Sequence, residues 1–193
     1  MSETGKIVTG RLPRLLRGRA WVWPDDVNTD IIIPFRFKAR TNDPVEMAKY
    51  AMYGFDPEFY KKVHPGDIFV AGRNFGGGSS REQAPVAIKY SGVSAVIAES
   101  IARIFYRNSF AIGLPALEVP DITKKVSQFD QVEVDLEEWS VKTVKDGQLH
   151  KAKKVPDFLT ELVKEGGVVE YYRRHKSFPW ERLEKIPVSK SDR

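Results

Sequence analysis

Strand-like and helix-like patterns alternate through the middle of the chain, and this alternation constrains the fold more than any other feature. Apolar segments at 68–72, 93–100 and 114–120 have the length of buried strands, and helical patterns at 82–92 and 101–113 separate them. A chain that alternates in this way packs helices on a sheet. We therefore predict a protein of the α/β class.

The flanking segments predict further elements. Residues 19–24 are typical of a short strand that ends at Pro24, residues 25–30 of a polar turn, and the β-branched segment 31–34 of an extended stretch. Residues 131–143 alternate strictly between apolar and polar side chains, which predicts one half-exposed strand before a hairpin turn at 145–148. Further helical patterns lie at 43–54, 56–67 and 155–175, the last broken at Gly166 and Gly167.

Composition excludes several classes of protein. The 193 residues are 41% hydrophobic and 30% charged, as expected for one soluble globular domain. No apolar run approaches the roughly 20 residues that a membrane span needs, and the N-terminus lacks the apolar core of a secretion signal. The chain has no cysteine, so it forms no disulfide and supplies no thiolate to an iron–sulfur cluster. We expect a cytoplasmic protein without a membrane partner.

Positive charge is concentrated at the C-terminus. Residues 171–193 contain seven basic and three acidic residues, and so hold most of the net charge of +5. A charge run of this kind usually forms a solvated tail or a strip that docks on an acidic partner. We predict a domain over residues 1–170 and a basic extension over residues 171–193, and we do not expect nucleic-acid binding.

The run GRNFGGGSSREQAP, residues 72–85, joins a predicted strand to a predicted helix. Backbone N–H groups at the start of a helix are unpaired, and the helix dipole there favours an anion. Ser79 and Glu82 also have the spacing of a capping box, so one alternative is a purely structural turn and cap.

Three features of the run favour a binding site over a simple cap. Two hydroxyls are present where a cap needs one, and three successive glycines (Gly76, Gly77 and Gly78) allow close approach of a ligand to the backbone. Arg81 follows at a position where the helix dipole disfavours a cation, unless an anion binds there. A serine beside these groups can act as a base next to a bound carboxylate.

Other catalytic motifs are missing from the run. It lacks the lysine and the spacing of a phosphate-binding P-loop, and it does not match G-x-S-x-G. The three histidines, at positions 64, 150 and 175, lie in polar or turn segments, where a surface position is expected. The residues alone therefore predict an anion site with a candidate serine base, and no more.

Three motifs resemble a known family: GRAWVWPDDVNTDIIIP, GRNFGGGSSREQAP and VIAESIARIFYRNSFAIGLP. Together they resemble the swivelling domain of the aconitase superfamily, and most closely the free-standing small subunits of 3-isopropylmalate dehydratase and of its homoaconitase relatives. The resemblance covers roughly residues 10–170 and implies a β/β/α sandwich.

The resemblance also implies a function. Such a small subunit carries no cofactor and pairs with a large subunit that holds a 4Fe–4S cluster on three cysteines. The pair removes and re-adds water on a 2-hydroxy di- or tricarboxylate, so it is a hydro-lyase with the outcome of an isomerase. Ser79 matches the family's catalytic base, whereas Ser80 and Arg81 match substrate-carboxylate contacts. The glycines would let substrate lie against the backbone.

The segment PFRFKART, residues 34–41, matches the loop that tunes substrate choice in this family, and Arg36 matches an arginine that contacts the variable end of the substrate. Lys38 and Arg40 depart from the common pattern, since relatives often carry less polar residues there. If these cations face the site they favour a polar substrate tail, and if they face solvent an isopropyl group is accepted. Gln83 replaces a histidine of many relatives, which leaves it a hydrogen-bonding role only.

Three functional alternatives remain. The resemblance favours 3-isopropylmalate as substrate, in leucine biosynthesis. A second alternative is a small subunit that acts on homoaconitate, a methylmalate or a dimethylmalate. A third is a binding or regulatory module without catalysis, but the presence of Ser79 and Arg81 argues against it.

Overall fold

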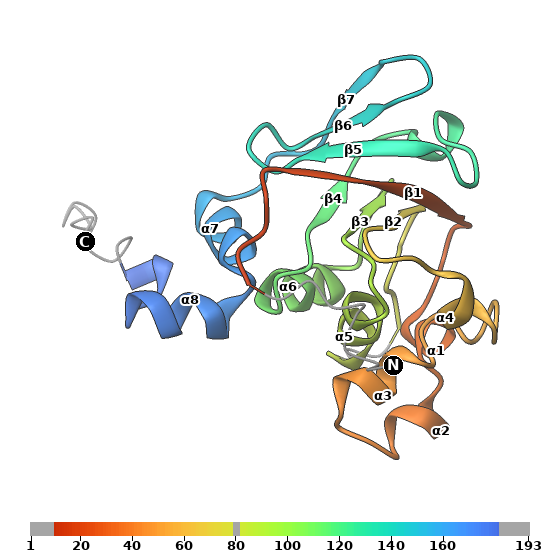
Figure 1. Ribbon diagram of the computed structural model, residues 1–193, viewed down its shortest axis with the longest axis horizontal. Coiled ribbons are helices and arrows are strands. Elements are labelled where there is room, and N and C mark those ends of the chain that lie inside the picture. The colour runs from red at the N-terminus through yellow and green to blue at the C-terminus, as the bar shows by residue number, and fades with distance from the viewer. Residues whose placement is uncertain (1–9, 79–81, 182–193) are drawn as a thin grey trace, which may run out of the picture.

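The computed structural model describes residues 10–78 and 82–181. Seven strands form one sheet in the order β4-β3-β2-β1-β5-β6-β7, in which β1 to β4 are parallel and β5 to β7 antiparallel (Figure 1). The strands are β1 (Leu15–Trp23), β2 (Ile68–Ala71), β3 (Ala95–Ala98), β4 (Ala116–Glu118), β5 (Gln131–Asp135), β6 (Ser140–Thr143) and β7 (Leu149–Lys151).

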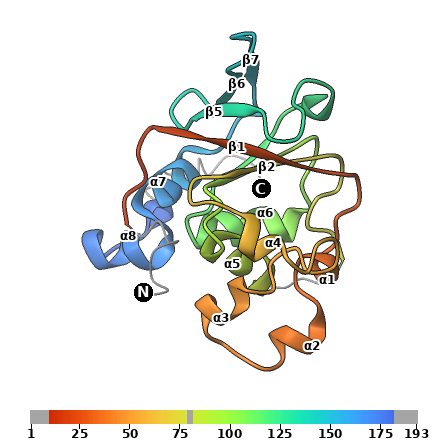
Figure 2. The ribbon, with the colours of Figure 1, turned by 45° about the vertical axis from the view of Figure 1, so that its right-hand side comes forward.

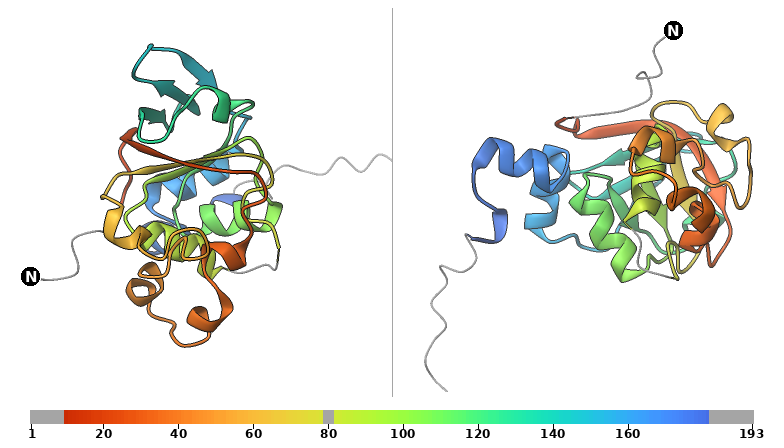
Figure 3. Two further views of the ribbon diagram at one scale, coloured as in Figure 1. Left: turned by 90° about the vertical axis from the view of Figure 1, so that its right-hand side faces the viewer. Right: turned by 90° about the horizontal axis from the view of Figure 1, so that it is seen from below.

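Helices surround the parallel half of the sheet. They are α1 (Thr29–Ile32), α2 (Phe35–Lys38), α3 (Pro44–Ala48), α4 (Phe59–Lys62), α5 (Gln83–Tyr90), α6 (Arg103–Ala111), α7 (Asp157–Glu165) and α8 (Val168–His175), with a short 3-10 turn, η2 (Ile122–Lys124). Helices α1 to α4 gather at one end of the molecule, and α7 and α8 at the other (Figures 1 and 3). The antiparallel strands form a separate layer over the parallel ones (Figure 2). The predicted α/β class is confirmed.

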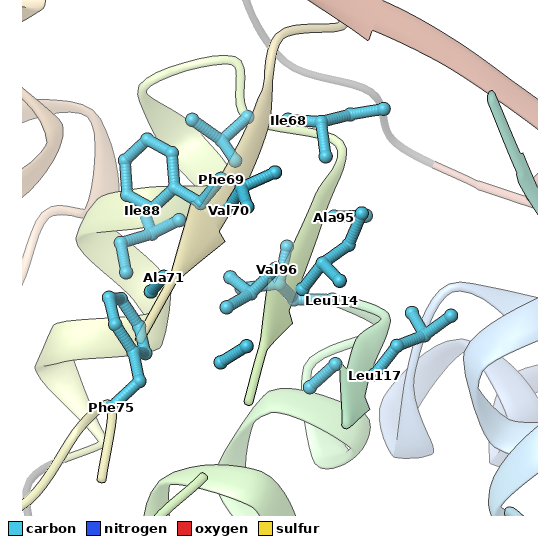
Figure 4. Packing of buried hydrophobic residues seen from close by; sticks show 14 of the residues in the cluster. Ile68, Phe69, Val70, Ala71, Phe75, Ile88, Ala95, Val96, Leu114 and Leu117 are labelled. Atoms are coloured by element: carbon cyan, nitrogen blue, oxygen red, sulfur yellow. The ribbon is translucent and has the colours of Figure 1, made fainter. Parts of the chain in front are cut away.

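The core lies around the central strands. Every residue of β2 and of β3 is buried, which explains why the segments IFVA and AVIA are continuously apolar rather than alternating. Ile88 of α5 and Leu114, just before β4, pack in the same core (Figure 4). Burying one such Val, Leu or Ile side chain contributes roughly 1.5–3 kcal/mol, so this layer fixes where β2 ends and the glycine run begins.

Strand β1 joins the two halves of the sheet. Its first part pairs antiparallel with β5, and its last four residues, from Ala20 to Trp23, pair parallel with β2. At Gly18 the backbone of the 66–67 turn comes so close that an added Cβ would lie 1.9 Å from the carbonyl oxygen of Gly66. No residue with a side chain fits that position without a shift of backbone.

A buried carboxylate fixes this junction. Asp67 is 3% exposed, and its carboxylate accepts hydrogen bonds from the Arg19 guanidinium (2.8 Å), from Trp21 Nε1 (2.7 Å) and from the backbone N–H of His64 (2.9 Å). Burial alone would raise the pKa of Asp67, but these hydrogen bonds, that of Arg19 first, hold the pKa below its usual value. The charged carboxylate therefore stabilises the junction of β1 with the start of β2.

The antiparallel layer differs from the sequence prediction. Residues 131–143 form two strands, not one, because the side chain of Asp135 accepts hydrogen bonds from the N–H groups of Glu137 (2.8 Å) and Glu138 (3.1 Å) and reverses the chain. Leu136 is fully buried inside this turn, and Trp139 has a φ of 47°. The alternation of apolar residues continues through the turn, so periodicity alone did not reveal it.

The first half of segment 31–34 differs from the extended stretch predicted for it, because α1 continues to Ile32. Asn28 caps a short helix, because its Oδ1 accepts from the N–H groups of Asp30 (3.0 Å) and Ile31 (2.9 Å). Ile32, the last residue of the helix, and Ile33, whose backbone is extended, are both fully buried, so the apolar run reflects burial rather than strand pairing. The cap at Asp43 and the strands and helices predicted for 68–120 appear within a few residues of the expected limits.

The C-terminal helices break at the predicted pair of glycines, where φ is 95° at Gly166 and 120° at Gly167. Glu165, 6% exposed, is paired with Arg11 (2.5 Å) and Arg174, which tie α7 and α8 to the N-terminal segment. Helix α8 runs across the predicted domain boundary at residue 170, and Tyr171 is buried. The boundary remains a prediction.

We expect Asp67→Asn to lower the free energy of unfolding by about 2 kcal/mol at neutral pH, because the hydrogen bonds to a charged acceptor are weakened. The pKa of Asp67 is lower in the folded state than in the unfolded chain, so its stabilisation is present above about pH 4 and is lost as the pH falls further. Urea unfolding at neutral and acidic pH measures the difference, which should shrink in acid.

Asp121→Asn is the matched control. Asp121 is exposed, and its side chain pairs only with Lys124 at 2.6 Å among the described residues, so the change should cost less than about 0.5 kcal/mol. Equal losses in the two variants would contradict the role of Asp67.

Candidate functional site

Three segments far apart in sequence meet just beyond the ends of the parallel strands. The N–H of Gly76 donates to Val27 O (2.7 Å), and the N–H of Thr29 donates to Gly77 O (2.9 Å). On the other side the N–H of Phe75 donates to Ser100 O (3.0 Å). Ligands of open α/β sheets bind at this end of the strands, so the glycine run lies where a site is expected.

The first residues of the run, 72–74, are braced by the 25–26 turn. The backbone N–H of Arg73 donates to the Asp25 carboxylate (2.7 Å), and the Arg73 guanidinium pairs with it (2.9 Å). These contacts, the backbone hydrogen bond first, lower the pKa of Asp25. The side-chain amide of Asn74 donates to Asp26 (2.9 Å), and Gly72 leaves no room for a Cβ beside Asp25. The direction of the run is therefore set by short polar contacts.

The three glycines have different reasons to be glycine. Gly76 has a φ of 76°, and an added Cβ would lie 2.2 Å from the ring of Phe105. Gly77 forms a bridge with Asn28 and tolerates a Cβ only tightly, 3.2 Å from the Asn74 side chain. Gly78 has a φ of 88°, and an added Cβ would lie in ordinary contact with Asn28 and Thr29, 3.5 Å from the nearest atom. The N–H of Gly76 already donates to Val27, so it is not available to an anion. The predicted anion cradle therefore needs backbone N–H groups that lie further along the run.

A hollow of about 320 Å³ lies beside the run. Helix α6 begins at its edge, with Ala102 as the N-cap and no side-chain cap among the described residues, so the positive end of the helix dipole faces this region. Arg103 adds a full positive charge. The hollow is lined by Thr29, Asn74, Gly76, Gly78, Ala102, Arg103, Ile104 and Phe105.

Ser79, Ser80 and Arg81 lie outside the described residues. Gly78, which lines the hollow, precedes Ser79 directly, and the described part of α5 begins at Gln83 with Glu82 as its N-cap. The predicted base and its two neighbours therefore belong to the short link between the hollow and α5, and their roles stay predictions.

The predicted specificity loop contains the short helix α2, next to α1 (Figure 1). Arg36 is exposed; its guanidinium lies over the rings of Phe37 (4.8 Å) and Tyr53 (5.6 Å) and makes no ion pair with the described residues. Arg40 is also exposed, and the side chain of Lys38 lies outside what the structure describes. The aromatic rings hold Arg36 while leaving its N–H groups open to an anion.

Sequence reasoning missed the contribution of Thr29, Asn74 and Arg103 to the hollow. All three stand in the motifs that carry the family resemblance, but they are 29 and more residues apart, and no local pattern places them together. Within the described part of the chain, no group of three His, Asp or Glu side chains could hold a metal ion, and the sequence has no cysteine.

Comparison with known proteins decides the family. A family model described as the aconitase C-terminal domain matches residues 34–122. A 3-isopropylmalate dehydratase small subunit from Thermodesulfovibrio yellowstonii is 48% identical over 162 residues, which are 84% of this chain and 96% of that protein. One from Methanosarcina acetivorans is 50% identical over 159 residues, 82% of this chain and 97% of that protein. This chain belongs to the family of 3-isopropylmalate dehydratase small subunits.

A solved structure supports the same assignment. The crystal structure of a 3-isopropylmalate dehydratase from Methanocaldococcus jannaschii superposes with a TM-score of 0.78 at 42% identity, and covers 89% of this chain and 99% of that one. A protein of that organism named isopropylmalate/citramalate isomerase small subunit is 46% identical over 160 residues. The predicted aconitase-type swivelling fold is thus confirmed. None of the described helices is long and apolar enough to cross a membrane.

The clash at Gly76 can be tested separately from its backbone conformation. Gly76→Ala should destabilise the protein by about 1–3 kcal/mol beyond the cost of the positive φ, because the methyl group meets the ring of Phe105. Gly147→Ala is the matched control, since Gly147 has a similar φ of 70° with nothing within 4 Å of an added Cβ. Thermal melting of both variants measures the difference, and equal shifts would show that φ alone requires glycine.

Proposed function

We propose that this chain is the small subunit of a two-subunit hydro-lyase that isomerises 3-isopropylmalate by removing and re-adding water. The observation that carries the proposal is the identity of 48–50% with 3-isopropylmalate dehydratase small subunits over nearly their whole length. The glycine run, bordered by a positively charged hollow, supports it, because the substrate of such an enzyme carries carboxylates.

The partner is a large subunit, as the word small in the relatives' names suggests. We assign the Lewis acid to a 4Fe–4S cluster on that subunit, where it would assist departure of the hydroxyl. The chain described here would bind, orient and deprotonate the substrate. The isolated chain is therefore proposed to be inactive.

The compartment that we propose is the cytoplasm, since a chain without cysteines gains no disulfide from an oxidising compartment.

Each residue of the link after Gly78 has a proposed role. Ser79, as the alkoxide, would take the proton from the carbon beside a carboxylate. The electron pair of that C–H bond would form the alkene as the C–O bond on the neighbouring carbon breaks, and the hydroxide that leaves would be accepted by the Lewis acid assigned to the partner. Re-addition with the opposite orientation returns the proton and gives the isomer. Ser80 and Arg81 would hold the carboxylate, and the backbone around Gly78 would let it approach. The N-terminus of α6 adds positive potential, which favours the developing negative charge.

Arg36 would contact the distal end of the substrate from α2. Arg40 is exposed in this chain, and an exposed cation does not by itself oppose an isopropyl group, which favours 3-isopropylmalate over the more polar homoaconitate. The Methanocaldococcus relative named isopropylmalate/citramalate isomerase small subunit favours one second candidate, a shorter methyl-substituted malate on the same site.

Ser79→Ala should lower kcat at least ~10²-fold with a smaller change in KM, because a general base acts in the transition state. Ser80→Ala is the matched control in the same link: it removes one contact to a bound carboxylate and should mainly raise KM. Steady-state kinetics with a reconstituted large subunit measure both. If Ser79 only caps a helix, its loss would cost about 1 kcal/mol of stability and leave kcat nearly unchanged.

Substrate choice is tested on the specificity loop. Arg36→Ala should raise KM, and the double change Lys38→Leu, Arg40→Val should keep the substrate ranking if both cations face solvent. The measurement is kcat/KM for 3-isopropylmalate, citramalate and homocitrate, on wild type and on each variant. If the double variant lowered kcat/KM for homocitrate and raised kcat/KM for 3-isopropylmalate, the two cations would be shown to select the substrate.

A further inference from the structure

A second hollow, of about 280 Å³, lies along α6. Arg103 and Arg107 line it from successive turns of the helix, and Lys153 and Lys154, which follow β7, line it from the opposite side. The two sides come together because the N–H of Lys153 donates to the carbonyl oxygen of Glu118 in β4 (2.8 Å). Four cationic residues thus surround one hollow.

The positive charge there is largely uncompensated. Glu118 is the single carboxylate among the lining residues, and it already accepts the N–H of Ile101 (2.7 Å) and pairs with Lys153 (2.8 Å). Arg103, Arg107 and Lys154 are exposed and make no ion pair within the described part of the chain. Other surface cations, such as Lys61 and Lys124, do pair with a neighbouring carboxylate. This hollow therefore favours an external anion.

Tyr106, which also lines the hollow, supplies a neutral donor. Tyr106 is half-buried, and burial first, then the charge of Glu118, raises the pKa of its hydroxyl to about 12. The hydroxyl consequently keeps its proton at any physiological pH and can donate to an oxygen acceptor. Guanidinium groups and a hydroxyl donor are the partners that a carboxylate prefers.

This second hollow shares a lining residue with the candidate site. Arg103 lines both hollows, and the neighbouring Ile104, which lines the hollow of the glycine run, is 48% exposed. Under the proposed function the large subunit must cover the glycine run, because substrate has to touch both chains at once. Protein interfaces have an apolar centre and a polar rim. The exposed Ile104 beside the run has the character of such a centre, and Arg107, about one helical turn further along α6, that of the rim.

We infer that Arg103, Ile104, Arg107 and Lys154 form the face on which the large subunit docks, the α6 face, and that carboxylates of that subunit enter the second hollow. The inference rests on the proposed function, since it names the surface that brings the two chains together. A free small carboxylate is the competing occupant of the second hollow. The partner is favoured because Arg103, which lines both hollows, is followed directly by the exposed Ile104 beside the glycine run, and a small carboxylate would not cover that side chain.

The test measures association of the small subunit with an immobilised, reconstituted large subunit at about 50 and about 300 mM salt, which screen charges to different extents. The double change Arg107→Glu, Lys154→Glu should slow association at least ~10-fold at low salt and reduce its salt dependence, as expected for a steering charge. Ile104→Asp should raise the dissociation rate about 10-fold at both salt concentrations, because it places a charge in the apolar centre.

Lys142→Glu is the matched control, since Lys142 is an exposed cation on β6, in the layer away from α6 (Figure 1). Its association rate should stay near that of wild type. The neutral double change Arg107→Gln, Lys154→Gln should give an intermediate rate, and thermal melting verifies that every variant is folded. Unchanged rates in the glutamate double variant, or an equal loss in Lys142→Glu, would overturn the inference.

Calorimetric titration of the small subunit alone with malate separates the two occupants. Malate binding that disappears in the glutamate double variant, together with unchanged association, would assign the hollow to a free carboxylate and overturn docking. A complex that forms but turns over no substrate would contradict the proposed function alone. Full turnover with unchanged association rates in all variants would overturn the α6 face alone.

Discussion

The carboxylate of Asp67 is the contact on which the rest of the structure most depends. It joins donors from Arg19 and Trp21 on β1 to the backbone at His64, just before β2 starts. Because β1 is shared by the parallel and antiparallel halves of the described sheet, a shift at this junction moves one half against the other. A charged group is suited to this role only because its hydrogen bonds outweigh the cost of burial.

The position of the candidate site follows from that junction. Strand β2 emerges from it, ends at Ala71 and passes directly into the loop that Asp25 and Asp26 brace. The chain beyond is fixed by main-chain contacts to Val27 and Thr29 and by the fit of Gly76 against Phe105. If the residues after Gly78 are to meet a substrate held by a second subunit, the main chain that leads to them has to be rigid.

The sequence predicted those parts of the fold whose signal is local. Continuous apolar runs identified β2 and β3, and the glycines at 166 and 167 identified a helix break. The split of 131–143 was missed because Asp135 reverses the chain without interrupting the alternation. The hollow was missed because Thr29 and Arg103 meet through long-range pairing, which no periodicity encodes. The residues of the glycine run alone predicted an anion site with a candidate serine base, whereas the specific roles of Ser79, Ser80 and Arg81 came from the family resemblance and stay predictions.

The bond from the Lys153 N–H to Glu118 has a consequence for how the protein behaves at high concentration. Strand β4 ends the parallel side of the sheet, and an open strand of this kind offers its backbone to other chains. Here the return of the 152–154 segment occupies part of that border and sets lysine side chains along it. The segment that borders the cationic hollow thus also covers part of the edge of β4, and this discourages strand-to-strand self-association.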